Sequence, residues 1–343
     1  MKSAFHSSKA KYVAAVIIVI CGTCATALAA DYANEDFSLR FPAALTRFAN
    51  YGDVAGVGGA SAGSKWSSSI NPASTSWLNC PKVICVSTQY SNLSFDNGSD
   101  FRVPAESVTV NAGPVGFFTV AAAQVSTNNE TLNDGLNFDF TADVAQLLWS
   151  KKPSEDWAIG LAFTYSKSAL KYQYSGYDVV RANSDSYSLR GGTLHKITDK
   201  LLAGLAVEYG WSSDRGGYIG PPDVVVRDST RQFLVRPGVS YEYMKDGTIY
   251  LDYQYGMFHN DTGTMAVHRI LTGIEHGFTK WLFGRLGTTI DPVIGADSFT
   301  CGVGFYPLSW LGVDVAYQYD MFPEMREEFG RSQTFNVSLS VTY

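Results

Sequence analysis

The chain has 343 residues and a formal net charge of −6, with only 17% charged residues and 14% aromatic residues. Ordinary soluble domains carry about 25% charged residues, so a large part of this chain faces something other than water. Binding to nucleic acid is not expected, because it depends on basic patches.

The first residues have the layout of a secretory signal peptide. Lys2, Lys9 and Lys11 precede an apolar run that begins at Val13, and Ala27-Leu28-Ala29 supplies small residues for cleavage. We therefore expect residues 1–29 to be removed on export. The alternative is a membrane anchor, but the apolar run is shorter than the ~20 residues of a spanning helix.

Residues 30–82 do not show the alternation of strands. The run 52–63 is built almost entirely of small residues, and such a backbone can pass through a confined space. We expect this segment to be a hatch inside a barrel, the alternative being a flexible extension. Its glycines do not form a nucleotide-binding motif, because no βαβ unit surrounds them. In an oxidising compartment Cys80 and Cys85 could form a disulfide near its end, the alternative being two unpaired thiols.

Residues 83–343 carry the period-two alternation of strands that place apolar side chains on lipid and polar or small ones on a lumen. The apolar rows of five segments are Trp157, Ile159, Leu161, Phe163 and Tyr165; Leu201, Ala203, Leu205, Val207, Tyr209 and Trp211; Ile249, Leu251, Tyr253 and Tyr255; Leu311, Val313, Val315, Tyr317 and Tyr319; and Phe335, Val337, Leu339, Val341 and Tyr343. Residues 184–196 and 265–276 are mixed, and only their spacing predicts strands.

The links between these strands alternate in length, which orients them. Short turns are expected at 151–156, 198–200, 245–247, 277–280 and 307–310, and longer links at 174–184, 212–231, 291–297 and 321–332. Bacterial barrels have short periplasmic turns and longer external loops. Trp149, Trp157, Trp281 and Trp310 lie beside the short turns, where an interfacial aromatic girdle is expected.

Eleven strands follow Leu136, and three more fit before it, at 83–95, 104–111 and 115–124, with a tight turn at 112–114. We therefore expect an all-β, transmembrane antiparallel β-barrel of about 14 strands, with the hatch in its lumen. The rival fold is a soluble β-sandwich, whose outer face would carry many more Lys and Glu residues.

Eight charged residues have the parity of the lumen face: Asp139, Asp143, Glu208, Arg236, Glu242, Asp252, Arg285 and Asp314. On the lipid face an Arg or Lys at mid-depth would cost about 2–4 kcal/mol. These groups either hold the wall and the hatch together, with Arg40 and Arg47 as partners, or line a water-filled route that selects solutes by charge.

No constellation of residues indicates catalysis or metal binding. The histidines do not combine at ligand spacing, and no C-x-x-C pair supports zinc. A catalytic triad assembles in space rather than in sequence, but nothing singles one out. We expect no enzymatic activity, no cofactor and no metal.

A Gly-Gly-Ala stretch, Gly58-Gly59-Ala60, is followed by the triplet Asn71-Pro72-Ala73 shortly before the first strand, and the chain ends in an aromatic-terminated strand. This layout resembles the FadL-type outer-membrane transporters for fatty acids and aromatic hydrocarbons. The resemblance implies fourteen strands, a hatch containing these six residues, and substrate release through a lateral gap in the wall. The external links here are short and polar, which argues against fatty acid and leaves a smaller hydrophobic compound or a different solute.

We therefore expect a passive transporter for small hydrophobic compounds in the bacterial outer membrane, with membrane lipid and the solute as partners. Two alternatives stay open from the sequence. One is a general porin-like channel for polar solutes, and the other is a structural or assembly barrel that docks secreted proteins. The sequence does not define an oligomeric state.

Overall fold

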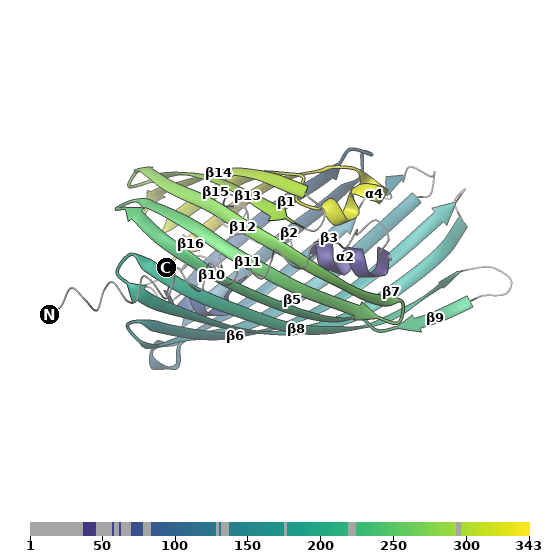
Figure 1. The fold of residues 1–343 in the computed structure, drawn as a ribbon, viewed down its shortest axis with the longest axis horizontal. Helices are drawn as coiled ribbons and strands as arrows, with labels where there is room; N and C mark the ends of the chain where they lie inside the picture. Colours follow the sequence, from purple (N-terminus) through teal and green to yellow (C-terminus); the bar gives the residue numbers. More distant parts are fainter. Residues whose placement is uncertain are drawn as a thin grey trace.

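The computed structural model describes residues 37–45, 57, 62, 70–77, 84–127, 130–131, 137–174, 177–218, 224–292 and 296–343. The expected signal peptide lies outside these residues. The strands form one antiparallel sheet that closes on itself (Figure 1). Two short strands, β4 (Glu130–Thr131) and β9 (Val224–Asp228), pair only with β5 and β8, respectively. The other fourteen strands form the barrel, which confirms the predicted fold and strand number.

The barrel strands are β1 (Ile84–Phe95), β2 (Asp100–Asn111), β3 (Phe117–Thr127), β5 (Asn137–Ser154), β6 (Trp157–Tyr174), β7 (Tyr177–Thr198), β8 (Leu201–Tyr218), β10 (Arg231–Met244), β11 (Gly247–Asn260), β12 (Gly263–Thr279), β13 (Leu282–Asp291), β14 (Ala296–Leu308), β15 (Leu311–Tyr319) and β16 (Ser332–Thr342). The helices are α2 (Phe37–Leu45), α4 (Arg326–Phe329), and the 3-10 helices η2 (Pro72–Trp77), η3 (Gly113–Val115) and η4 (Pro323–Met325).

The first and last barrel strands close the sheet. β1 pairs with β16 along its length, and backbone hydrogen bonds between Ile84 and Tyr343 extend the ladder at 3.1 and 2.7 Å. Closure satisfies the backbone groups that an open edge would expose to hydrocarbon, which is why spanning sheets are barrels.

The outer face of the wall is apolar, as the alternation predicts. Leu161, Phe299 and Phe335 are each about half exposed and point away from the lumen. All five apolar rows read from the sequence lie on this face. This is the surface that lipid requires of a spanning barrel. Among the described residues, no helix is long and apolar enough to cross a bilayer.

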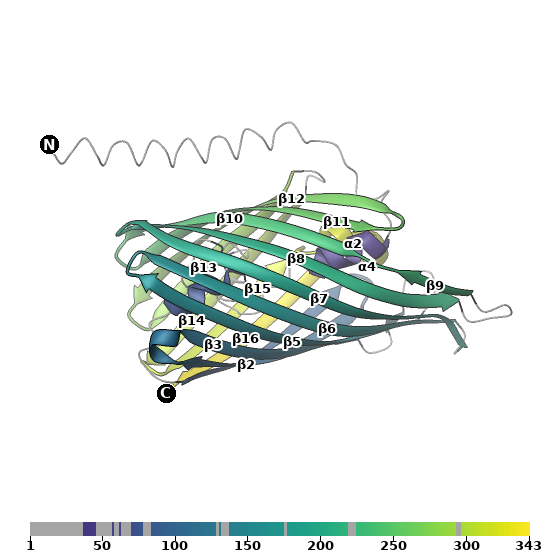
Figure 2. The same cartoon turned by 90° about the horizontal axis from the view of Figure 1, so that it is seen from below.

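The two ends of the barrel differ. At the turn end the links are short, such as 155–156, 199–200 and 245–246, and Trp157, Trp281 and Trp310 lie exposed beside them. The loop end carries the longer link 320–331, and β6, β7 and β8 extend there (Figure 2). β7 has 22 residues, about twice the 9–11 of a strand that only crosses a bilayer.

The long links expected at 174–184 and 212–231 were wrong. β6 continues to Tyr174 and β7 begins at Tyr177, while β8 reaches Tyr218 and pairs with β9. Polar residues such as Ser184 and Asp214 are opposite each other in this ladder. The strands extend past the apolar band, so their side chains no longer need the alternation that marks a lipid-facing strand.

The described parts of the segment 37–77, named here the inner segment, lie within the barrel. α2 contacts β12 on one wall, and Phe41 of α2 packs edge-on against Phe140 of β5 on another, with ring centroids 5.0 Å apart. η2 contacts β5, β6 and β7 near the turn end. The described ends of the segment therefore lie at opposite ends of the lumen (Figures 1 and 2).

Candidate functional site

A large apolar cluster fills part of the lumen near the loop end. It combines residues of the inner faces of β1, β2, β3 and β5 with residues of α2 and of the link 320–331. Its buried members are Ala44, Leu93, Phe95, Phe101, Val103, Val125, Phe138, Phe140, Ala142, Met321, Phe322, Met325 and Phe329. We name it the loop-end cluster. A water-filled channel would have polar side chains at these positions. This part of the lumen is instead lined by apolar side chains, which favour contact with apolar groups over contact with water.

Phe329 is the centre of the loop-end cluster. It is fully buried, and its ring lies 5.1 Å from that of Phe95, 5.5 Å from Phe138 and 5.9 Å from Phe101. The pairs with Phe101 and Phe138 are edge-on, and such ring pairs add about 0.5–1.5 kcal/mol each to the gain from burial. The link 320–331, named here the cap loop, is thus anchored into the lumen by Phe329 together with Met321, Phe322 and Met325.

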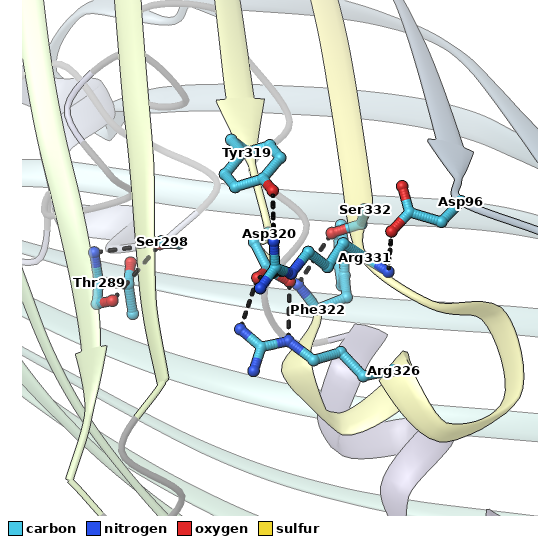
Figure 3. Close-up of polar contacts among 9 residues, drawn as sticks. All are labelled: Asp96, Thr289, Ser298, Tyr319, Asp320, Phe322, Arg326, Arg331 and Ser332. Carbon is cyan, nitrogen blue, oxygen red and sulfur yellow. Dashed lines mark hydrogen bonds and ion pairs between the residues drawn. The ribbon is translucent and has the colours of Figure 1, made fainter.

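Polar contacts fix the cap loop to the rim of the barrel (Figure 3). The Asp320 carboxylate accepts hydrogen bonds from Arg326 Nε at 3.0 Å and Nη2 at 2.5 Å, and the Asp320 backbone has a φ of 59°. Asp is one of the few residues that adopt this left-handed conformation readily. The backbone amide of Arg331 donates to Asp96 in the adjacent turn at 3.2 Å.

Two arginines connect the cap loop with α2. Arg40 of α2 donates to Glu324 O at 3.2 Å and to Glu328 Oε1 at 2.5 Å. Arg269 of β12 donates to Ala43 O at 3.0 Å and to Glu324 Oε1 at 2.6 Å, with both charged side chains almost fully buried. Wall, helix and cap loop therefore share one charged network. These Arg40 contacts are with groups of the cap loop, which the sequence did not indicate as its partners, and Arg47 lies outside the described residues.

At the turn end, η2 presses against glycines of the wall. A Cβ atom on Gly160 would lie 2.4 Å from the Pro72 backbone, and one on Gly192 would lie 2.1 Å from Asn71 Oδ1. Asn71 Nδ2 donates to Thr193 O of β7 at 2.9 Å and to Ala62 O at 2.7 Å. Asn71, Pro72 and Ala73 therefore contact the lumen wall. The other three expected hatch residues, Gly58, Gly59 and Ala60, lie outside the described residues.

An ion pair of the wall also binds the inner segment. Asp252 Oδ2 on β11 accepts a hydrogen bond from Arg236 Nε at 3.0 Å and another from the Ala62 backbone amide at 2.6 Å. The Arg236 and Asp252 side chains are 8% and 1% exposed. One carboxylate oxygen thus links two strands of the wall to a backbone group inside the lumen.

Five of the eight charges predicted on the lumen face are buried there: Glu208, Arg236, Asp252, Arg285 and Asp314. Glu242 has the same parity and is half-buried near the turn end. Each buried charge has an opposite partner, as in Arg190–Glu208 at 2.5 Å and Arg285–Asp314 at 2.5 Å. Pairing of this kind holds the wall together, which supports the structural interpretation over a charge-selective channel.

Asp139 and Asp143 were placed wrongly, because they lie on the outer face. They share the parity of Leu147, which is 59% exposed, whereas Phe138 and Phe140 point into the lumen. Asp143 accepts a hydrogen bond from Gln124 at 3.0 Å in an exposed position, and Asp139 lies 4.0 Å from Lys171. On β5 the side chains that face the loop-end cluster are apolar, which reverses the usual polar lumen face. The polarity of the residues therefore predicts the wrong face for this strand.

Sequence reasoning also missed several lumen charges, among them Arg190, Arg269, Glu275 and Glu324. Arg190 and Glu275 lie directly opposite Glu208 and Arg285 in the ladders, so the pairing of those strands would have found them. Arg269 lies in the mixed stretch 265–276, where the inward neighbours Val267 and Leu271 are apolar. Nothing in the sequence places Glu324, which lies on a link.

Among the residues that the structure describes, the cysteines and acidic groups form no recognisable centre. The Cys85 sulfur on β1 accepts a hydrogen bond from Thr342 Oγ1 at 3.7 Å. Its expected partner, Cys80, lies outside the described residues, so the disulfide stays a prediction. In the described part of the chain, no three His, Cys, Asp or Glu side chains are placed to hold a metal ion.

No protein-family model and no curated protein matches the sequence. Solved structures match it in fold. The toluene transporter TodX of Pseudomonas putida is 11% identical, with 80% of this chain and 92% of that chain covered and a TM-score of 0.51. A Pseudomonas aeruginosa FadL homologue is also 11% identical, with 86% and 95% covered and a TM-score of 0.52. The chain therefore has the fold of the FadL-type transporters, as the resemblance in its sequence predicts.

Proposed function

We propose that the protein is a passive transporter that carries small hydrophobic compounds across the bacterial outer membrane after export by its signal peptide. The observation that carries this proposal is the loop-end cluster, which makes one end of the lumen apolar. A general porin for polar solutes needs a continuous aqueous lumen. The transporters of the same fold, one of them a toluene transporter, support the proposal.

In this mechanism the inner segment acts as the hatch. A hydrophobic solute leaves water for the loop-end cluster, which lowers its free energy by about 25 cal/mol per Å² of apolar surface buried. The contacts of η2 with the wall and of Ala62 with Asp252 hold the lumen closed to ions. The solute then moves down its concentration gradient, with no bond chemistry.

The exit in this proposal lies between β2 and β3, beside the loop-end cluster. The pairing of these strands passes from Arg102–Ser126 to Ala105–Ala123 and omits Val103 and Pro104. Proline has no amide hydrogen to donate to a ladder. Fewer backbone hydrogen bonds must therefore break for the wall to open between these two strands. This fits the lateral release implied by the resemblance.

Conductance in planar bilayers tests the hatch, with a matched pair of glycine variants. Gly192→Ala places a methyl group where Asn71 and Pro72 lie, whereas the adjacent Gly191 faces outward and has room for one. We expect wild type and Gly191→Ala to give almost no ion current, and Gly192→Ala to give open-channel steps. Large steady steps from the wild type would contradict a hatch and favour a porin.

A further inference from the structure

Three buried polar oxygen atoms on the inner face of the β1–β16 seam have no hydrogen-bond partner in the structure. They are Gln89 Oε1, Thr334 Oγ1 and Asn336 Oδ1, on side chains that are 4%, 2% and 1% exposed, respectively. Asn336 is directly opposite Ser91, two residues from Gln89, and Thr334 is opposite Leu93. The three residues therefore form one area of the wall, named here the acceptor patch.

The acceptor patch calls for a hydrogen-bond donor. Amide oxygens only accept, and the Gln89 amide nitrogen already donates to Ser91 Oγ at 2.8 Å. Buried polar atoms without a partner are rare in folded proteins, because they lose their hydrogen bonds to water and gain none in return. The folded protein already bears the free-energy cost of burying these oxygen atoms. A ligand that donates a hydrogen bond to one of them removes part of that cost when it binds.

The surroundings of the acceptor patch are apolar or small. On its loop-end side lie Leu93, Phe101 and Val103, all members of the loop-end cluster. The residue opposite Asn336 on β15 is Ala316, and the residue opposite Gln89 on β2 is Ala105. A ligand that reaches the patch therefore places its hydrocarbon part on the cluster and its polar end on the oxygen atoms.

The nearest charges disfavour an anionic ligand. Asp314 is opposite Ser338, which is itself opposite Gln89. Asp314 and Glu275 both pair with Arg285, at 2.5 and 2.6 Å, so this group of three carries one net negative charge. A carboxylate would meet two amide oxygens that only accept, and negative charge beyond them, with the Thr334 hydroxyl as the one patch group able to donate to it.

We propose that the acceptor patch binds the hydroxyl group of a neutral hydroxylated hydrocarbon, and that the transporter prefers such compounds to carboxylates. This inference rests on the proposed function and specifies its substrate class. The preference comes from oxygen atoms buried beside an apolar surface, an arrangement that rewards one donor on an otherwise apolar molecule.

Calorimetric titration of the full-length protein in detergent tests the proposal, after subtraction of titrations into empty micelles. The ligands are 4-ethylphenol, ethylbenzene and 4-ethylbenzoate, which share the same ring and ethyl group. We expect 4-ethylphenol to bind most tightly. Asn336→Leu and the isosteric Thr334→Val should each weaken its binding about 2- to 10-fold, the range of one hydrogen bond.

Gln333→Leu is the matched control, because it makes a similar exchange on the outer face of the same strand. It should leave the affinity for 4-ethylphenol unchanged. Equal affinity for 4-ethylbenzoate, or two patch variants that bind like wild type, would overturn the acceptor patch. Uptake by whole cells distinguishes this failure from failure of the function. Faster uptake of ethylbenzene and 4-ethylphenol without preference overturns only the patch, whereas uptake of neither overturns the transporter.

Discussion

Single charged residues in the lumen each serve more than one element. Arg285 pairs with Glu275 and Asp314 and also donates to the Tyr306 hydroxyl at 3.1 Å. Arg269 joins β12, α2 and the cap loop. Charges buried in this way need partners, because an unpaired buried ion costs several kcal/mol. The structure therefore uses charge to position parts of the lumen relative to one another.

Asp252→Asn should both destabilise the barrel and loosen the inner segment. It removes the negative charge that Arg236 contacts at 3.0 Å and weakens the acceptor of the Ala62 amide. Breaking a buried pair typically costs about 3–5 kcal/mol. Urea unfolding in lipid vesicles measures the loss, and Asp199→Ala, at an exposed turn, is the control that should leave the midpoint unchanged. Equal midpoints for Asp252→Asn and wild type would exclude this role.

Glu328 gives the cap loop a pH dependence. Burial raises the pKa of its carboxyl above the ordinary value, and the Arg40 hydrogen bond opposes the shift. Protonation therefore favours the folded state, so this stabilisation is complete below pH about 4.5 and is lost as the pH rises through the raised pKa.

Glu328→Gln should remove this pH dependence. Its stability advantage over wild type should therefore grow as the pH rises from 4 to 7. Urea midpoints across this range measure it, and Glu327→Gln, on the exposed carboxylate beside the same Arg40, is the control. A loss of stability that is the same at every pH would show that the ion pair, not burial, dominates.

Among the elements, the wall was predicted well from the sequence and the lumen contents were not. β15 and β16 alternate fully because Asp314, Gln318 and Asn336 point inward and apolar residues meet lipid. β5 and β12 break the pattern, since Phe138, Phe140 and Val267 are inward and apolar. Which residues meet across the lumen depends on closure of the barrel, which no local pattern encodes.

Phe329 is the fully buried ring at the centre of the cap loop's apolar contacts, so Phe329→Ala should loosen the loop. Removing a buried phenylalanine costs about 3–5 kcal/mol, and local opening of the loop should therefore become at least about 100-fold more frequent. Trypsin cleavage at Arg326, within α4, measures the opening. Phe335→Ala, on the outer face of β16, is the control and should leave the cleavage rate unchanged. Cleavage of Phe329→Ala at the wild-type rate would contradict an anchoring role.

At the scale of the whole molecule, two surfaces define what the barrel does. The outer face is apolar, and the lumen combines an apolar loop end with paired charges and the inner segment. The proposed passive transport of hydrophobic solutes needs both features, an outer face suited to lipid and a lumen that is apolar at one end.

The most direct test of this account is uptake of labelled ethylbenzene and glucose by cells with and without the gene. A passive hydrophobic transporter should accelerate ethylbenzene entry severalfold and leave glucose entry unchanged. Faster entry of glucose, or no effect on ethylbenzene, would contradict it.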